Sequence, residues 1–359
     1  MYRINDQTKL VKGIKSRNRI VMPPMDTLMA ENGIANDFHI QHYGARAYGG
    51  VGTIIVESTA VSSEGRIREK DLGLWNDEQI IPMKRIADIA HQAGAVIGVQ
   101  LNHAGAKAEL DIETFGTTKY FDYLDQSKLT ILTPKEIARI EEDFVQAASR
   151  AKQAGFDFVE LHAAHGYLLN EIYHPFLNTI DDEKDIVKRS QLIINIASRI
   201  EKEVGIRMGI RLSIVDDVDY SELKIEHMKP LVEALDPFMD YFHISSGSNL
   251  ANVDFLKLMA DAGTKLFRIG YAKEVRKWTD KNIITVGNYQ TREDVEFALK
   301  ENVDFVAIGR EVIANPNVTI NNLLDVNEMD DVQYHWNQNL WFTPKQYKDL
   351  IESLNKKEK

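Results

Sequence analysis

Cysteine is absent from all 359 residues of the sequence. Its absence excludes disulfide bonds, cysteine nucleophiles, iron–sulfur clusters and thiolate zinc sites together. Any chemistry in this chain must therefore use histidine, tyrosine, arginine, carboxylates or a bound cofactor.

Long hydrophobic runs and an excess of basic residues are also missing. No apolar stretch approaches the roughly 20 residues of a membrane-spanning helix, and residues 1–6 show no hydrophobic region of a signal peptide. The formal net charge is −11 and the sequence pI is about 5.5, which argues against a nucleic-acid footprint or a basic membrane-binding face. We expect a cytoplasmic protein that binds neither nucleic acid nor membrane.

The composition that is present is that of an ordinary globular protein. Hydrophobic residues make up 44% of the chain and charged residues 27%, which is enough apolar material for a large core. Length alone suggests two domains, but barrels of alternating strands and helices often reach this size as one domain.

Eight short runs of β-branched and apolar residues recur along the chain, and each ends at a polar or glycine-containing break. Such runs are typical of parallel strands that are buried on both faces. The eight predicted strands are residues 19–22, 52–56, 96–100, 158–161, 208–212, 241–244, 283–286 and 305–308.

The segments between these strands have helical character. Thr133 is followed by Pro134 and then by Glu136, which is the pattern of a capped helix start. Several of the segments stop at glycine, a common helix end. The predicted helices are residues 77–93, 133–154, 185–204, 222–235, 269–280 and 291–301.

Eight strands that alternate with helices, without a break in composition, predict a single (β/α)8 TIM barrel over residues 1–333. A doubly wound sheet is the alternative architecture. That fold usually carries a glycine-rich fingerprint after its first strand, whereas this chain has Pro23-Pro24-Met25 there.

Two stretches fall outside the repeat. Residues 105–133 form a long loop after the third strand, which would lie at the mouth of a barrel as a lid or substrate loop; a purely structural surface loop is the alternative. Residues 334–359 form an aromatic-rich C-terminal extension with a predicted helix at 344–354. We expect it to pack on the barrel or on a partner subunit of a homo-oligomer.

In a parallel barrel the carboxyl ends of all strands meet at one mouth. The residues at these ends are therefore expected to lie close together. They are Pro23, Pro24, Met25, Asp26, Ser58, Gln100, Asn102, His103, His162, His165, Tyr167, Arg211, Ser245, Gly287, Gly309 and Arg310.

The last two strand ends, Gly287-Asn288 and Gly309-Arg310, have the composition of a phosphate site. Glycine lets backbone N–H groups approach an anion, and arginine adds a forked donor. Barrels frequently bind phosphate between these two strands. Either pair alone could be a plain turn, but together they predict a phosphate site, with a short helix following from Pro316.

The other strand ends offer hydrogen-bond donors, with no obvious nucleophile and no pair of carboxylates. A donor-rich mouth beside a phosphate site suits a cofactor that carries out the chemistry itself. Flavin mononucleotide (FMN) fits, with Gln100 facing its uracil-like edge and Arg211 stabilising negative charge on the reduced ring. At this stage His162 and His165 could still be metal ligands, bases or caps.

Four motifs, in order, resemble the Old Yellow Enzyme family. They are residues 18–25 (Asn-Arg-Ile-Val-Met-Pro-Pro-Met), 100–105 (Gln-Leu-Asn-His-Ala-Gly), 162–168 (His-Ala-Ala-His-Gly-Tyr-Leu) and 308–311 (Ile-Gly-Arg-Glu). The resemblance runs from about residue 18 to residue 315.

The resemblance implies an FMN-dependent ene reductase on a (β/α)8 barrel, which uses NADH or NADPH to reduce the C=C bond of unsaturated carbonyl compounds. His162 and His165 would bind the carbonyl oxygen, and Tyr167 would donate the proton. The FMN contacts would fall on Pro23, Pro24, Met25, Asp26, Ser58, Gln100, Arg211, Gly287, Gly309 and Arg310. No metal is expected.

The sequence departs from this family pattern at several positions. Asp26 stands where relatives often have cysteine, threonine or glycine, and an ionised carboxylate facing the ring would lower the flavin potential. Leu28 replaces a tyrosine of the nearest subgroup, and Ala106 stands where an arginine is common. The stretch after Pro175 lacks expected Gly-Gly-Ser and Glu-Asn-Arg signals. These changes bear on substrate range and efficiency.

Three other functions remain open. The chain could be the barrel part of a dienoyl-thioester reductase, whose larger relatives add an iron–sulfur cluster and a further domain. It could bind flavin without efficient turnover. It could also be a metal-dependent hydrolase that uses His162 and His165, although Gln100 and Arg211 would then have no role.

Overall fold

Eight parallel strands close into a barrel in the computed structural model, which describes residues 2–121, 124–180, 182–216, 223–248 and 266–325. Each strand pairs with its neighbour in the chain, and β1 pairs with both β2 and β11, which closes the ring. The barrel strands are β1 (Ile20–Met22), β2 (Thr53–Ala60), β4 (Val96–Asn102), β7 (Phe158–Ala163), β8 (Arg207–Ser213), β9 (Tyr241–Ser245), β10 (Asn282–Val286) and β11 (Phe305–Ala307). The predicted (β/α)8 barrel is confirmed.

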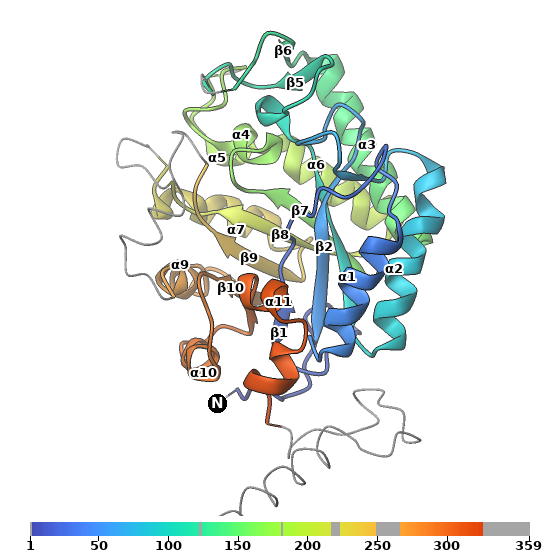
Figure 1. The fold of residues 1–359 in the computed structure, drawn as a ribbon. Helices are drawn as coiled ribbons and strands as arrows, with labels where there is room; N and C mark the ends of the chain where they lie inside the picture. The colour runs from blue at the N-terminus through green and yellow to red at the C-terminus, as the bar shows by residue number, and fades with distance from the viewer. Residues whose placement is uncertain (1, 122–123, 181, 217–222, 249–265, 326–359) are drawn as a thin grey trace, which may run out of the picture.

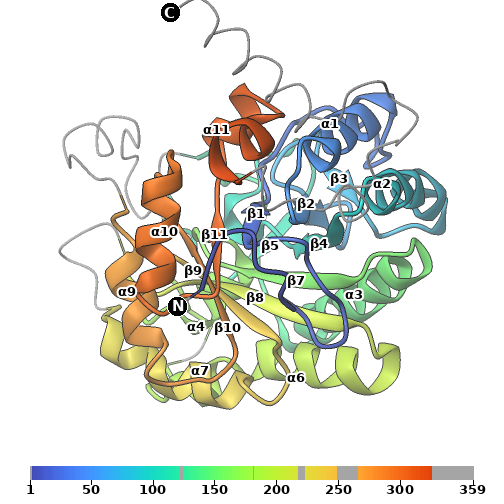
Figure 2. The same ribbon diagram turned by 90° about the horizontal axis from the view of Figure 1, so that it is seen from below.

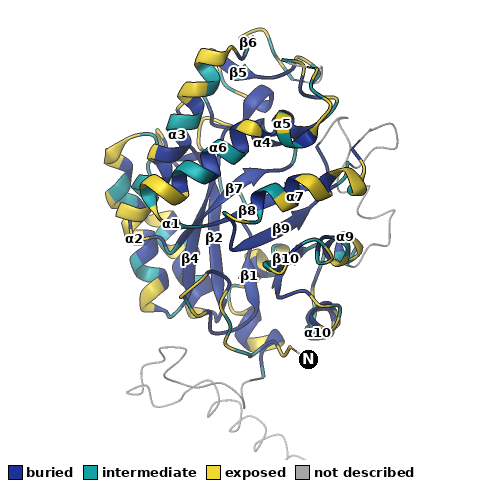
Figure 3. Ribbon diagram, turned by 180° about the vertical axis from the view of Figure 1, so that it is seen from behind, coloured by how far each residue is buried: buried dark blue, intermediate teal, exposed yellow. Residues whose placement is uncertain are grey.

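Helices surround this barrel, with their exposed faces outward and the strands buried inside (Figure 3). The α-helices are α1 (Asp37–Tyr48), α2 (Ile80–Gln92), α3 (Pro134–Gln153), α4 (Leu168–Tyr173), α5 (Ile186–Arg189), α6 (Gln191–Arg199), α7 (Lys229–Leu235), α9 (Ile269–Val275), α10 (Arg292–Lys300) and α11 (Arg310–Ala314). Shorter 3-10 and π-helical turns are η1 (Asp77–Gln79), η2 (Gly105–Lys107), η3 (Ile200–Val204), η4 (Ile225–Met228) and η5 (Thr319–Leu323). The last of these is the short helix expected after Pro316.

Helix α1 was not predicted, although it carries a start signal. The Asn36 side chain accepts a hydrogen bond from the backbone at the start of the helix, and the His39 ring accepts one from the backbone N–H of Asn36. Histidine takes the place that glutamate or glutamine usually has in this motif. Tyr43 and Ala47 lie on the buried face at helical spacing, so the periodicity was available in the sequence.

Three predicted helices are longer than the observed ones. In the stretch 222–235 the α-helix covers only α7, because residues 225–228 form the 3-10 turn η4. The stretch 185–204 divides at Ser190, whose ψ of 14° takes the backbone out of the helical path between α5 and α6. The stretch 269–280 ends its α-helix at Val275, because the N–H groups of Lys277 and Trp278 bond three residues back and tighten the chain into turns.

The long loop after the third barrel strand contains structure of its own. Within it, β5 (Thr114–Gly116) and β6 (Leu129–Ile131) form a small parallel sheet that lies at the top of Figure 1, above α4. A two-residue strand, β3 (Leu72–Gly73), extends the barrel sheet at the end of β2. The predicted boundary at residue 333 and the extension 334–359 lie outside the described residues.

An apolar layer fills the lower part of the barrel interior. Figure 2, seen from below, shows the N-terminal segment in dark blue crossing this end of the barrel. The segment is tied to β10, because the side chain of Asn282 donates to the carbonyl oxygens of Lys9 and Leu10. The buried side chains of the layer are Leu10, Val11, Val21, Ile55, Val96, Phe158, Tyr241, Ile284, Phe305 and Ala307.

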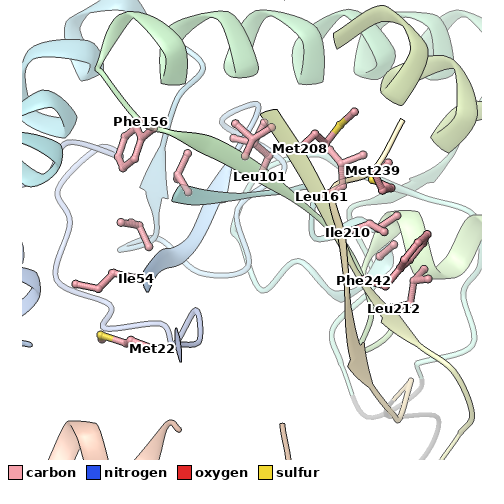
Figure 4. Close-up of a cluster of buried hydrophobic side chains, with 14 of the residues drawn as sticks. Met22, Ile54, Leu101, Phe156, Leu161, Met208, Ile210, Leu212, Met239 and Phe242 are labelled. Atoms are coloured by element: carbon pink, nitrogen blue, oxygen red, sulfur yellow. The ribbon is translucent and has the colours of Figure 1, made fainter. Parts of the chain in front are cut away.

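A second and larger cluster packs the outward-facing strand side chains against the helices. Figure 4 shows part of it, with Leu161 of β7 close to Met208 and Ile210 of β8. In α3 the residues Phe144 and Ala148 face the barrel. Burying a large aliphatic or aromatic side chain contributes about 1.5–3 kcal/mol, so this layer holds the frame on which the strand ends are placed. No helix in the described part of the chain is long and apolar enough to cross a membrane.

Candidate active site

The turn after β7 brings the motif histidines and tyrosine together. His165 has a φ of 63°, a left-handed conformation that costs a non-glycine residue about 1–2 kcal/mol. Three contacts hold its backbone: the N–H donates to Gly247 O at 3.1 Å and lies 3.0 Å from Ser213 Oγ, and the carbonyl accepts from Lys107 Nζ at 2.8 Å. At Gly166 a Cβ atom would lie 2.2 Å from the carbonyl oxygen of Ser248, so only glycine fits.

The three side chains form one cluster. The ring centroids of His162 and His165 are 5.1 Å apart, and those of His162 and Tyr167 are also 5.1 Å apart. His165 Nε2 lies 2.7 Å from Ser245 Oγ. His162 Nδ1 is fully buried and has no hydrogen-bond partner among the described residues. A buried polar atom without a partner is costly, and a bound ligand is one way to satisfy it.

Electrostatics keep these side chains neutral. Burial and then the charge of Arg211 lower the pKa of both histidines well below the ordinary value. Burial, followed by the charges of Asp26 and Asp71, raises the pKa of Tyr167 far above its usual range. At neutral pH the cluster therefore offers imidazole N–H groups and a protonated phenol.

A polar layer lies between the apolar floor of the barrel and this cluster. Glu160, which is fully buried, accepts from Gln100 Nε2 at 2.8 Å and from the Tyr241 hydroxyl at 3.0 Å, and it lies 3.0 Å from His243 Nδ1. Burial alone would raise the pKa of Glu160, but His243 and Arg211 hold it below the ordinary value. Arg211 therefore has a buried counter-charge next to the mouth.

A cavity of about 360 Å³ opens beside the cluster. Seven of the predicted cofactor residues line it, together with His165. They are Pro23, Pro24, Met25, Arg211, Gly287, Gly309 and Arg310. Three predicted residues do not line it: Asp26, Ser58 and Gln100, of which Gln100 instead donates to Glu160.

The predicted phosphate end is built from two loops that touch each other. Arg310 Nη2 donates to Asn288 Oδ1 at 2.7 Å and so joins the loop after β10 to the start of α11. Arg268, which was not predicted, lines the same cavity with its guanidinium 4.3 Å from the ring centroid of Phe267. Three arginines, Arg211, Arg268 and Arg310, thus line one cavity, which suits an anionic ligand.

Comparison with protein-family models shows to which family the chain belongs. Residues 10–322 match the model of the NADH:flavin oxidoreductase / NADH oxidase family. The chain belongs to this family. The predicted resemblance to Old Yellow Enzymes is confirmed, and the protein is an FMN-dependent oxidoreductase that takes electrons from a nicotinamide nucleotide.

Several members of the family are similar over most of the chain. The NADPH dehydrogenase of Listeria welshimeri is 36% identical over 312 residues, which are 85% of this chain and 90% of that protein. The NADPH dehydrogenase of Bacillus subtilis is 32% identical over 313 residues, with the same coverage.

Solved structures share the fold. A morphinone reductase variant in complex with tetrahydroNAD has a TM-score of 0.75 at 24% identity and covers 96% of this chain and 100% of its own. 2-Naphthoyl-CoA reductase has a TM-score of 0.78 at 21% identity, with 88% of this chain covering only 51% of that protein. At these identities the likeness shows the barrel alone.

The residues of this family member fit FMN. The cavity combines the apolar side chains of Pro23, Pro24 and Met25 with three arginines, as a flat ring and a phosphate require. Arg268 and Arg310 would hold the phosphate, and Arg211 would lie near the ring. Asn288, which was part of the predicted phosphate site, lines the same cavity. Tyr289 and Gln290 also line it; they were not predicted, although they directly follow Asn288 in the sequence. No local sequence pattern indicates Arg268.

Asp26 follows β1 and is influenced by two other carboxyl side chains, Glu57 within β2 and Asp71 directly before β3. It accepts a hydrogen bond from Ser58 N–H at 3.2 Å, and Glu57 accepts from Thr27 and Tyr43. Asp26 is exposed in the structure, so solvent screens its charge; desolvation by the surrounding protein, followed by the charges of Asp71 and Glu57, raises its pKa to about 7. The pKa of Glu57 is also raised to about 7, chiefly by burial.

We expect the Asp26→Asn variant to have a slightly higher Tm than the parent at pH 8, because solvent screens the exposed carboxylate, and the same Tm near pH 4. The folded pKa of Asp26 lies above its ordinary value of 3.8, so this group's contribution to stability is lost as pH rises through about 7. Asparagine keeps the acceptor for Ser58 without the charge. Thermal unfolding of both holoenzymes at several pH values measures the difference, and a Tm difference that does not change with pH would contradict it.

Proposed function

We propose that this protein reduces the C=C bond of α,β-unsaturated carbonyl compounds, with His162 and His165 binding the carbonyl oxygen and Tyr167 donating the proton. One observation carries the proposal: two neutral imidazoles and a protonated phenol form a single cluster at the edge of the FMN cavity. Neutral N–H groups are suited to an oxygen that gains negative charge during a reaction.

The side chains have complementary tasks in this reaction. When bound, FMN supplies the hydride that adds to the β-carbon. Negative charge then develops on the carbonyl oxygen, where each imidazole donor contributes about 3 kcal/mol of transition-state stabilisation. The O–H bond of Tyr167 breaks, its proton forms the new bond to the α-carbon, and the phenolate recovers a proton from water.

The alternatives are less well supported by the same residues. The described residues bring together no group of three or more side chains suited to a metal ion. The motif histidines instead lie near two cations, Lys107 and Arg211, which would repel a metal. A flavin protein without efficient turnover is the second candidate, because Leu28, at φ 56°, and the loop after Pro175 depart from the family pattern. A reductase for dienoyl thioesters is the third, because its larger relatives share the opening of residues 21–25, Val-Met-Pro-Pro-Met.

Incubation of the purified holoenzyme with NADH or NADPH and 2-cyclohexenone, without oxygen, tests the proposal. We expect yellow protein that releases FMN on denaturation, consumption of one nicotinamide per ketone, and the saturated ketone as product by mass spectrometry. Oxidation of the nicotinamide only when oxygen is admitted would overturn the proposal in favour of the non-reducing flavin protein. Reduction of a 2,4-dienoyl thioester but not of the ketone would overturn the proposal in favour of the dienoyl-thioester reductase.

A further inference from the structure

Lys107 is a buried lysine whose amine contacts two residues of the active-site motif. It ends η2, directly after β4, and is 8% exposed. Its Nζ donates to the carbonyl oxygen of His165 at 2.8 Å and lies 4.7 Å from the ring centroid of Tyr167. A side chain from one strand end thus reaches across to the strand end 58 residues away.

The position of this amine is unusual for a buried cation. Burying an ammonium group is costly unless a carboxylate pairs with it. No carboxylate among the described residues lies at ion-pair distance from Lys107. The nearest acidic groups act from farther away: Glu171 on α4 uses its oxygens for the N–H groups of Ala106 and Thr117, and Glu109 follows in the loop.

Other neighbours of the amine are aromatic or belong to the motif. The ring of Phe121 lies 5.9 Å from Nζ on another side, and Gly166 leaves the space that the lysine chain occupies. The charge of Lys107 adds to burial and to Arg211 in lowering the pKa of both His162 and His165. The amine therefore acts on all three motif residues: it donates a hydrogen bond to the backbone of His165, lies near the ring of Tyr167, and its charge acts on the imidazoles of His162 and His165.

We propose that Lys107 is a positioning residue of the reduction: it holds His165 in its left-handed backbone conformation and places positive charge on the face of Tyr167. The inference rests on the proposed role of Tyr167 as proton donor. When the Tyr167 O–H bond breaks, the electron pair stays on the phenolate oxygen and spreads into the ring. A cation over that ring stabilises the developing charge and so favours transfer of the proton to the α-carbon.

Lys107→Met and Lys107→Arg holoenzymes test the inference. Methionine keeps the length of the chain without its charge, and arginine keeps the charge. We expect Lys107→Met enzyme that has been reduced beforehand to reduce 2-cyclohexenone roughly tenfold more slowly than the parent does. A factor of this size corresponds to the loss of a partly desolvated cation–π contact. The rate at which NADPH reduces the enzyme should change less than about twofold. Lys107→Arg should recover most of the lost rate of ketone reduction.

The pH profile separates this role from a merely structural one. Burial lowers the pKa of Lys107 to about 8, so the charge is present below that pH and is lost above it. In the parent, the rate of ketone reduction should fall as pH rises through about 8, toward the Lys107→Met value. Lys107→Arg should show no fall there, because guanidinium stays charged.

Binding of p-nitrophenolate gives a readout that does not depend on turnover. Titrated at pH 7.5 into the oxidised holoenzyme, it should bind roughly tenfold more weakly to Lys107→Met than to Lys107→Arg, since only the latter keeps a cation near the motif. Equal affinity for both variants would count against the inference.

Parallel measurements on Tyr167→Phe distinguish failure of the two proposals. If Tyr167→Phe is slow but Lys107→Met keeps the parental rate and pH profile, the role of Lys107 is wrong and the proposed function stands. If Tyr167→Phe reduces the ketone at the parental rate, the proton-donor role fails and the inference with it. The double variant Lys107→Met/Tyr167→Phe should reduce the ketone no more slowly than Tyr167→Phe alone, because the lysine acts through the tyrosine. A double variant whose loss of rate is the product of the two single losses would overturn the inference. If Lys107→Met does not retain FMN, the pH profiles of ketone reduction by the parent and by Lys107→Arg test the inference without it.

Discussion

Replacing both His162 and His165 by alanine should slow ketone reduction by the pre-reduced enzyme about a thousandfold or more and abolish phenol binding, with FMN still bound. A single oxyanion donor typically accounts for about 10²–10³ in rate, and both donors are neutral and adjacent here. Stopped-flow kinetics of the two half-reactions and a phenol titration measure these effects.

The backbone of His165 dictates the control for this experiment. Alanine is strained at a φ of 63°, so part of the loss could come from the turn. Asparagine tolerates that conformation and keeps an N–H donor. The variant His162→Asn/His165→Asn should therefore retain measurable phenol binding. Loss of FMN together with preserved phenol affinity would show that the two histidines serve the cofactor and not the substrate.

Replacing Tyr167 by phenylalanine should slow ketone reduction by roughly 10²–10⁴-fold, the usual contribution of a placed general acid, and leave reduction of the enzyme by NAD(P)H unchanged. Phenylalanine preserves the packing of the ring beside Ile67, Ala104 and Ala108. Rate constants for the two half-reactions, measured separately, show the effect.

Tyr173→Phe is the matched control for Tyr167→Phe. The Tyr173 hydroxyl is buried on α4 and contacts the carbonyl oxygens of Ala163 and Ser213 at 3.0 and 2.8 Å. Its loss should lower stability by about 1–2 kcal/mol and leave the ratio of the two half-reaction rates as in the parent. Equal slowing of both half-reactions in Tyr167→Phe would remove the proton-donor role.

The sequence was informative where local pattern determines structure. Each barrel strand is buried on both faces, so its composition differs sharply from the flanking polar turns, and all eight strands could be located. Because parallel strands end at one mouth, that list also placed His165, Arg211 and Arg310 around a shared cavity. Helix α1 was missed because its capping pair, Asn36 and His39, uses an uncommon partner.

Contacts that depend on the register of neighbouring strands or on how far a side chain extends could not be predicted from the sequence. Gln100 and Glu160 are register partners on β4 and β7, but their pairing requires knowing which strands neighbour each other. Lys107 follows a recognisable motif, yet its contact with Tyr167 depends on the path of two loops. Arg268 lies in a stretch without a pattern, and only the closed barrel brings it to the phosphate end.

The way the N-terminal segment closes the floor of the barrel has a consequence for biosynthesis. Leu10 and Val11 pack against side chains as distant as Ile284 and Phe305, and β1 finds its second partner only in β11. Leu10 and Val11 leave the ribosome long before these partners and must therefore wait, with their apolar side chains unburied, until residues 284–305 have been made. Contacts of such long sequence separation form slowly, and a chain waiting in this state is exposed to aggregation. Ribosome-bound chains that stop before residue 305 should for this reason depend on chaperones more than the finished protein does.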